Sequence, residues 1–322
     1  MNIPDLATRI PTETDAYLLL EEWRWHGEPV CPHCGSVNKH YPITPREGVA
    51  KTNRGTATAR REWKCKDCRK KFTVLTNTIM HGTHIPIRTW VFVIFELCAS
   101  KNGIAAREIE RRYNLAPKSA WFMLHRIREA MANGPGAELF SGIVVADETW
   151  IGGKPKNRHA KDRRGAKQGK TDKTPVLSLI NAATGEVRSK VVTNVSRDTL
   201  RSAIAEQVVI PETTLHTDTM SSYASMASDF AGHQSVNHSA GEYVRDGVST
   251  NKLENYFSQL KRSIDGTHHN VSRRHLGRYL AEFDYRFTTH GLKDSERVSG
   301  LMDRVGGRRL SYRVSSAGVS ML

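Results

Sequence analysis

Two cysteine pairs constrain the fold of this chain more than any other feature of its sequence. Cys31 and Cys34 form one CxxC pair, Cys65 and Cys68 form the other, and 30 residues separate the pairs. Four thiolates suit tetrahedral Zn²⁺ in a closed structural site. We therefore predict a zinc ribbon over residues 31–80, with a long connection between its two knuckles.

Other readings of these cysteines are a redox-active CxxC or unrelated core thiols. His33 and His40 could in principle substitute as ligands, although four cysteines already complete the zinc shell. The fifth cysteine, Cys98, lies in an apolar run, which predicts a plain core residue. No secretory signal is visible at the N-terminus, so we read the cysteines as intracellular thiols and not as disulfides.

The charge of the chain predicts a polyanionic partner. Its 322 residues hold 48 Lys and Arg against 33 Asp and Glu, a net charge of +15. Stretches 51–71 and 154–173 supply +14 of this charge. Nucleic acid is the expected partner. In the second stretch we assign DNA contacts to four residues: Lys154, Arg163, Arg164 and Lys167. The alternative is that such a run is only a solvated loop.

Length and hydropathy point to a multi-domain protein without a transmembrane helix. The longest apolar stretch, around residues 90–99, is roughly half the ~20 residues that a membrane span needs. We therefore expect a cytoplasmic, nucleoid-associated protein. At ~150 residues per domain, the length favours about two domains.

Residues 85–132 have the pattern of a helix-turn-helix. Apolar positions recur at helical spacing over 104–113 and again over 119–131, and Pro117 lies in the break between them. Arg126 and Arg128 lie off the apolar stripe of the second helix, so we predict that they contact DNA. An ordinary αα-hairpin has the same pattern.

Residues 141–290 alternate β-rich and helical patterns, and three acids mark them. Asp147 lies near the end of the first strand-like run, Asp218 ends a later one, and Glu254 lies on a late helix over 251–263. The order is three strands, a helix, a strand and a helix. That order is the layout of a ribonuclease H-like fold, within an α+β multi-domain chain.

The residue types suit phosphodiester chemistry. Cutting or joining a phosphodiester uses two divalent cations ~4 Å apart, and Mg²⁺ or Mn²⁺ prefers oxygen ligands. We predict that Asp147, Asp218 and Glu254 hold these ions. Lys261 lies nearly two turns after Glu254 on the same helix face, where it could hold a phosphate; Arg262 follows it as a further DNA contact. Taken singly, an Asp at a strand end is usually a turn former.

The cysteine pairs, the helical pattern and the three acids together resemble those of the insertion-sequence transposases of the DDE superfamily, in the branch with an N-terminal zinc ribbon. The resemblance covers roughly residues 15–290. Six segments carry it: Cys31–Ser36, Cys65–Thr73, Trp121–Arg128, Val145–Lys154, His216–Asp218 and Asn251–Arg262.

The resemblance implies DNA cleavage and strand transfer, with terminal inverted repeats and target DNA as partners and a dimer or higher multimer as the active form. By position, Asp147, Asp218 and Glu254 would be the metal-binding acids. The 35 residues between Asp218 and Glu254 are the separation found in DD35E-type enzymes. Asn251 and Glu242 are the rival candidates for the third ligand, and the plain alternative for Glu254 is a surface acid.

Two rival functions follow from the same features. One is a DNA-binding regulator with an inert acidic domain, and the other is a nuclease that cuts without joining. The expected boundaries are a helical segment over 1–30, the ribbon over 31–80, the helix-turn-helix over 85–132, the catalytic domain over 141–290 and a tail over 291–322.

Overall fold

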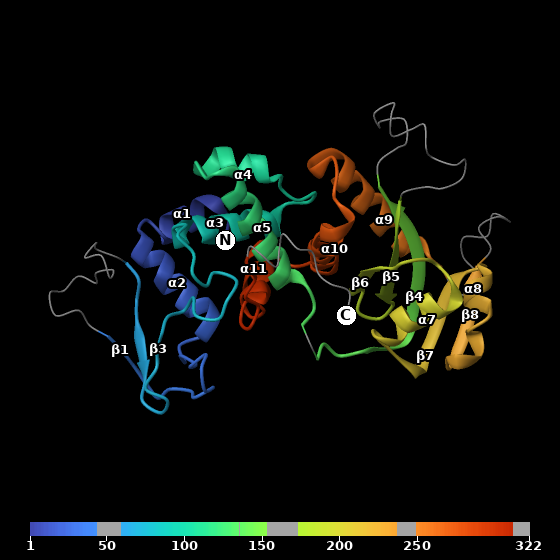
Figure 1. The fold of residues 1–322 in the computed structure, drawn as a ribbon, viewed down its shortest axis with the longest axis horizontal. Helices are drawn as coiled ribbons and strands as arrows, with labels where there is room; N and C mark the ends of the chain where they lie inside the picture. The colour runs from blue at the N-terminus through green and yellow to red at the C-terminus, as the bar shows by residue number, and fades with distance from the viewer. Residues whose placement is uncertain (44–58, 135, 153–172, 237–248, 312–322) are drawn as a thin grey trace. The chain divides into compact units, whose positions relative to one another are not determined.

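The computed structural model describes residues 1–43, 59–134, 136–152, 173–236 and 249–311. Lys154, Arg163, Arg164, Lys167 and Glu242 lie outside the described residues. The chain divides into two compact units. The first holds residues 1–131 and the segment that starts at Gly291, and the second holds residues 132–290. Helices and sheets occur in both units, which confirms the α+β multi-domain class (Figure 1).

The first unit begins with two capped helices. α1 spans Ile3–Arg9 and α2 spans Glu13–Trp25, and each starts with a capping box in which an Asp at the third position binds back to the cap. Such reciprocal hydrogen bonds satisfy amide groups that a helix start leaves free. The helix α2 turns its buried side, which includes Leu20, into the unit.

A small antiparallel sheet follows these helices. Its strands are β1 (His40–Pro42), β2 (Trp63–Cys65) and β3 (Lys71–Phe72), in the order β1-β2-β3. The Trp25 ring meets Trp63 and Phe72 edge-on, at centroid distances of 5.7 and 6.0 Å. These aromatic contacts give a sheet this small the apolar support that its few strands cannot supply.

Four further helices complete the first unit: α3 (Ile87–Ala99), α4 (Ala106–Tyr113), α5 (Pro117–Met131) and α11 (Asp294–Met302). The helix α11 packs against α3, and Arg297 Nη1 donates a 3.2 Å hydrogen bond to the carbonyl of Cys98. Our expectation of a tail was therefore wrong over Asp294–Met302, which returns to the N-terminal unit as a packed helix. Cys98 is buried, as expected.

The second unit is built on a five-stranded mixed sheet in the order β6-β5-β4-β7-β8. Its strands are β4 (Phe140–Ile151), β5 (Thr174–Asn181), β6 (Val187–Val191), β7 (Val208–Asp218) and β8 (Gly232–Val236). The pairs β4–β5 and β5–β6 are antiparallel, whereas β4–β7 and β7–β8 are parallel. This is the ribonuclease H-like arrangement, and β8 is a strand that the sequence patterns did not reveal.

Helices cover both faces of this sheet (Figure 1). Side chains alternate along β4: Val144 and Ala146 pack with α7 (Arg197–Ala205) and α8 (Ser221–Ala224), while Val145 packs with α9 (Asn251–Ser263) and α10 (Arg273–Thr288). A 3₁₀ turn spans Ala227–Asp229, and a π-helical stretch, Ile264–His268, extends α9. The sheet is therefore buried on both sides, as its apolar strands require.

Within the described part of the chain, no helix combines the length and the apolar character needed to cross a membrane.

Candidate functional site

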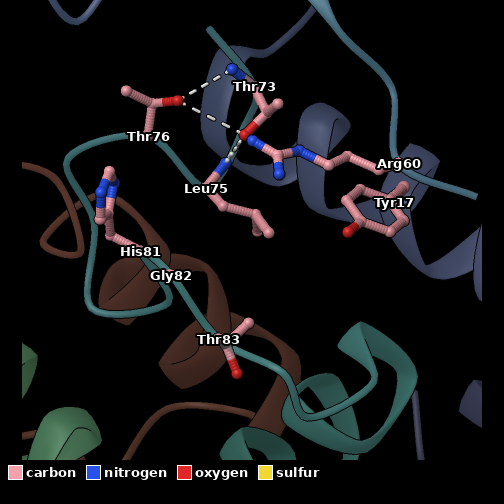
Figure 2. Close-up of a pocket in the computed structure, with 8 residues that line it drawn as sticks. All are labelled: Tyr17, Arg60, Thr73, Leu75, Thr76, His81, Gly82 and Thr83. Carbon is pink, nitrogen blue, oxygen red and sulfur yellow. Dashed lines mark hydrogen bonds between the residues drawn. The ribbon is translucent and has the colours of Figure 1, made fainter. Parts of the chain in front are cut away.

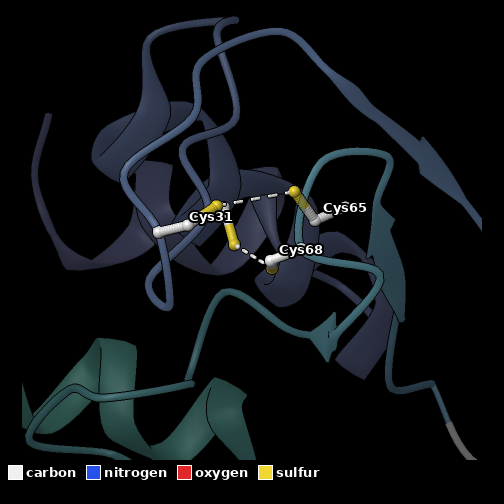
Figure 3. A group of neighbouring side chains, drawn as sticks. Cys31, Cys65 and Cys68 are labelled. Atoms are coloured by element: carbon white, nitrogen blue, oxygen red, sulfur yellow. Dashed lines mark hydrogen bonds between the residues drawn. The ribbon is translucent and has the colours of Figure 1, made fainter.

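The four cysteines of the two CxxC pairs come together in the first unit. Their sulfur atoms all lie within 4.8 Å of one another. Cys31 Sγ lies 3.7 Å from Cys68 Sγ (Figure 3). Cys34 Sγ lies 3.7 Å from Cys65 Sγ. These separations are far longer than the ~2.05 Å of a disulfide. The cysteines are free thiols arranged around one point.

This geometry fits a zinc ion. Zn–S bonds of ~2.3 Å in a tetrahedron place the sulfur atoms about 3.8 Å apart. Burial raises the pKa of the Cys31 thiol to about 12, whereas the hydrogen bond with Ser36 lowers that of Cys34 to about 6. Ser36 Oγ also lies 2.5 Å from the Asp67 carboxylate, so this residue bridges the two knuckles.

Two of the predicted acids lie on neighbouring parallel strands of the second unit. Val145 of β4 is paired with His216 of β7, and Asp147 and Asp218 follow two residues further along each strand. Because side chains alternate along a strand, both acids belong to the sheet face that α9 and α10 cover. Both are partly exposed, and each carboxylate accepts a backbone amide: that of Glu148 at 2.7 Å and that of Met220 at 3.0 Å.

The third predicted acid lies on the helix over that face. Leu253 and Phe257 of α9 pack into the core on β4 and β5. Glu254 lies in the first turn of α9, and Lys261 lies seven residues later; both are exposed and flank the buried stripe on the same side. Arg262 is also exposed, and its Nε donates to the Ser258 carbonyl at 3.3 Å.

The three acids share one sheet face and its covering helix, but they are not drawn into a close cluster. Across the described residues, the four cysteines form the group of His, Cys, Asp and Glu side chains with donor atoms near enough to hold an ion. Asp147, Asp218 and Glu254 form no such group. Their donor chemistry suits Mg²⁺ or Mn²⁺. Their assignment as ligands therefore stays a prediction.

A buried carboxyl next to these acids was missed by the sequence reasoning. Glu148 faces the opposite side of the sheet from Asp147, and it accepts a hydrogen bond from the buried hydroxyl of Tyr223. Burial, together with the charges of Asp147 and Asp218, raises the pKa of Glu148 to about 7. The consecutive Asp-Glu in the sequence was the available signal, because two adjacent strand residues face opposite sides.

A second polar network lies beneath α9. Ser178 is directly opposite Asp147 on β5, and its Oγ lies 2.8 Å from that of Ser189 on β6. Ser189 donates its amide and its hydroxyl to the two carboxylate oxygens of Asp284 on α10, at 2.8 and 2.7 Å. Tyr256 of α9 donates to the same carboxylate at 2.6 Å. The network thus connects the sheet to both helices.

The two arginines predicted to read DNA are in the interior of the first unit. Arg126 and Arg128 are 6% and 1% exposed. Arg126 Nη2 donates to the carbonyl of His81 at 2.7 Å, and its guanidinium lies over the Trp90 ring, 5.2 Å from the centroid. Both side chains lie off the apolar stripe of α5, as expected, but they are buried because the rest of the unit also covers that side of the helix. The two helices and the turn between them are present, but this burial gives no support to α5 as a recognition helix.

Residues 139–288 match the ISXO2-like transposase domain, and residues 11–71 match the transposase zinc-ribbon domain. A protein of Halobacterium salinarum, described as an uncharacterized protein in transposable element ISH50, is 26% identical over 287 residues. That alignment covers 85% of this chain and 90% of the relative. The first domain spans the mixed sheet and its helices, and the second spans the cysteine cluster.

Proposed function

We propose that this chain, which belongs to the DDE transposases of insertion sequences with an N-terminal zinc ribbon, binds the terminal inverted repeats of its element and catalyses metal-dependent DNA cleavage and strand transfer. One observation carries the proposal. Asp147 and Asp218 occupy matching positions on neighbouring parallel strands, on the face that the Glu254 helix covers.

Each acidic residue has a defined role in this proposal. Asp147, Asp218 and Glu254 would hold two Mg²⁺ or Mn²⁺ ions, which when bound activate the attacking oxygen and stabilise the leaving oxygen of a phosphodiester. Lys261 and Arg262 would bind backbone phosphates beside these acids, because both are exposed cations on the same helix. Phosphate contacts position a duplex without selecting its sequence.

The zinc ribbon would supply folding energy to the N-terminal part of the chain. Cys31, Cys34, Cys65 and Cys68 would hold one Zn²⁺, which no catalytic step uses, because four protein ligands leave no open position. The partners would be the two ends of the element and a target duplex, bound by a dimer or higher multimer. The basic residues Lys154, Arg163, Arg164 and Lys167 would contact DNA, and the protein would then associate with the nucleoid.

Incubation with DNA tests this function directly. The probe is a labelled duplex that carries one end of the element encoding this chain, mixed with a plasmid target and Mg²⁺. Joined end–target products, mapped by sequencing, are expected from the unaltered chain and absent with Asp147→Asn. Cut ends without joined products would make the protein a nuclease. Bound but uncut DNA would make it a regulator.

A further inference from the structure

The first unit contains a cavity of about 290 Å³, beside the segment that joins the small sheet to α3. Tyr17 of α2, Arg60, and three residues of the joining segment, Thr76, His81 and Thr83, are among the residues that line it (Figure 2). Its volume leaves room for a small hydrated group and not only for a single water molecule. The cavity is separate from the acids of the second unit and from the cysteine cluster.

Three polar side chains that line this cavity each have a proton to donate. Thr83 Oγ1 already accepts hydrogen bonds from Trp90 Nε1 at 2.9 Å and from the Ile85 amide at 3.1 Å, so its own proton is left to donate. His81 Nδ1 accepts the Asn77 amide at 3.2 Å, which places the proton of the neutral ring on Nε2. The Tyr17 hydroxyl has no acceptor among the residues that the structure describes. A ligand that offers only acceptors would satisfy all of them.

The charge around the cavity is positive. Arg60 lines it, and Arg126 lies behind it with a guanidinium bound to the His81 carbonyl. Arg126 is 6% exposed, its Nε lacks a hydrogen-bond partner, and no carboxylate pairs with it in the described ranges. A buried cation without a carboxylate partner favours a nearby anion.

The pKa of His81 agrees with this charge, whereas the pKa of Tyr17 shows that an acid also acts on the cavity. Burial and the charges of Arg309, Arg126 and Arg60 lower the pKa of His81. Glu13 is an acid that acts on Tyr17, but its carboxylate already accepts the amides of Ile87 and Arg88, at 2.5 and 3.0 Å. Positive charge therefore acts on the His81 side of the cavity, where donors remain for an anion.

We propose that this cavity binds one phosphate group of the DNA backbone. A phosphodiester is anionic and presents only acceptor oxygens to the Tyr17 hydroxyl, the His81 Nε2–H, the Thr83 hydroxyl and the Arg60 guanidinium. That DNA supplies this phosphate rests on the proposed function. In this arrangement Arg126 acts on the phosphate through the field of its charge, although it is too deeply buried to read a base.

Two pairs of variants test the site in the full-length, zinc-loaded chain. Tyr17→Phe removes one donor and no charge, and should weaken binding of a 30-base-pair duplex about tenfold, as expected for a hydrogen bond to a charged group. Tyr41→Phe, an exposed tyrosine on β1, is its control and should bind normally. Arg60→Gln should lower the slope of log affinity against log salt by ~0.9, the value for one phosphate, whereas Arg60→Lys should keep the slope.

A second arm identifies the source of the anion. Inorganic phosphate is titrated against the same variants, with its stabilising effect on thermal unfolding as the readout. Losses in both the DNA and the phosphate arms support the proposal. A loss of phosphate binding alone would overturn the assignment to DNA, and unchanged binding in both arms would overturn the site. Binding is measured without Mg²⁺, so this test does not depend on catalysis. Failure of the unaltered chain to cut or join DNA in the presence of Mg²⁺ would count against the proposed function and not against this site.

Discussion

The hydroxyl of Tyr256 on α9 donates a 2.6 Å hydrogen bond to the carboxylate of Asp284 on α10, and Ser189 of β6 binds the same carboxylate twice. Tyr256 is two residues from Glu254 on the same helix. Through this carboxylate the sheet and the two helices that cover one of its faces are held together. The position of α9, and with it the position of Glu254 relative to the sheet, therefore depends on a group remote from the predicted metal ligands.

This carboxyl predicts a pH-dependent stability. Burial raises the pKa of Asp284 from its ordinary value of 3.8 to about 7. Between these values the unfolded chain loses the proton that the folded chain keeps, so the free energy of unfolding falls as pH rises from 4 to 7. Asp284→Asn should flatten this fall by up to ~1.4 kcal/mol per pH unit, measured by urea unfolding at several pH values. Asp265→Asn, an exposed acid of the same unit, should leave it unchanged. An identical profile in the two variants would contradict the assignment.

The buried pair of Tyr223 and Glu148 predicts a coupled stability effect. Tyr223→Phe removes the donor to a buried carboxyl and should lower the free energy of unfolding by roughly 1–3 kcal/mol. The double variant with Glu148→Gln should lose less free energy of unfolding than the two single variants together. The reason is that no buried carboxyl is then left without its donor. Additive losses in urea unfolding would show that the two groups act independently.

The cysteine cluster predicts one zinc ion per chain. Metal analysis of protein purified without chelator should find about one equivalent, and Cys65→Ser should lose it. The same variant should lose the structure of the ribbon while the mixed sheet of the second unit stays folded, as followed by circular dichroism. Cys98→Ser is the control, because this buried cysteine lies outside the cluster. Zinc-free unaltered protein would refute the prediction.

Single substitutions on α9 can identify the third metal ligand. Glu254→Gln keeps the size of the side chain and removes its charge, so strand transfer should be lost by a factor of at least about 100 while DNA binding persists. Asn251→Ala, one turn earlier on α9, should retain strand transfer. The assignment would be reversed if Asn251→Ala abolished joining and Glu254→Gln did not.

The basic stretch over 154–173 predicts a change in salt dependence. Residues 154–172 of this stretch lie outside the described ranges, so the prediction rests on sequence charge alone. A triple variant should lower the slope of log affinity against log salt by ~0.9 per lost phosphate contact. In this variant Ala replaces Arg163, Arg164 and Lys167. The preference for the element's own ends should remain, because phosphate contacts carry no sequence information. An unchanged slope would make this stretch a solvated loop.

Local chemistry let the sequence predict some features in detail. The CxxC pairs indicated a four-cysteine cluster, because ligand type and spacing are written along the chain. The helix expected over 251–263 is α9 with the same bounds, since its apolar spacing defines it locally. The strand-like runs around Asp147 and Asp218 likewise correspond to β4 and β7.

Tertiary packing decided what local patterns could not. Helical periodicity showed which residues of α5 share a face, but it did not show that neighbours cover the other faces too; Arg126 and Arg128 are buried for that reason. Residues 294–302 looked like a polar tail, yet they form a helix that docks on α3, because long-range burial outweighs composition.

By itself, the sequence determined which chemical groups the chain offers: thiolates that suit zinc, three carboxylates that suit hard divalent cations, and an excess of cations that suits a polyanion. Only the tertiary structure decided which of these groups share a surface. Asp147 and Asp218 are separated by 70 residues in the sequence, and the parallel pairing of β4 with β7 places them in matching positions. Tyr17 and His81 likewise meet at one cavity only through folding. Such contacts follow from strand register and helix packing between distant segments, which no local pattern encodes.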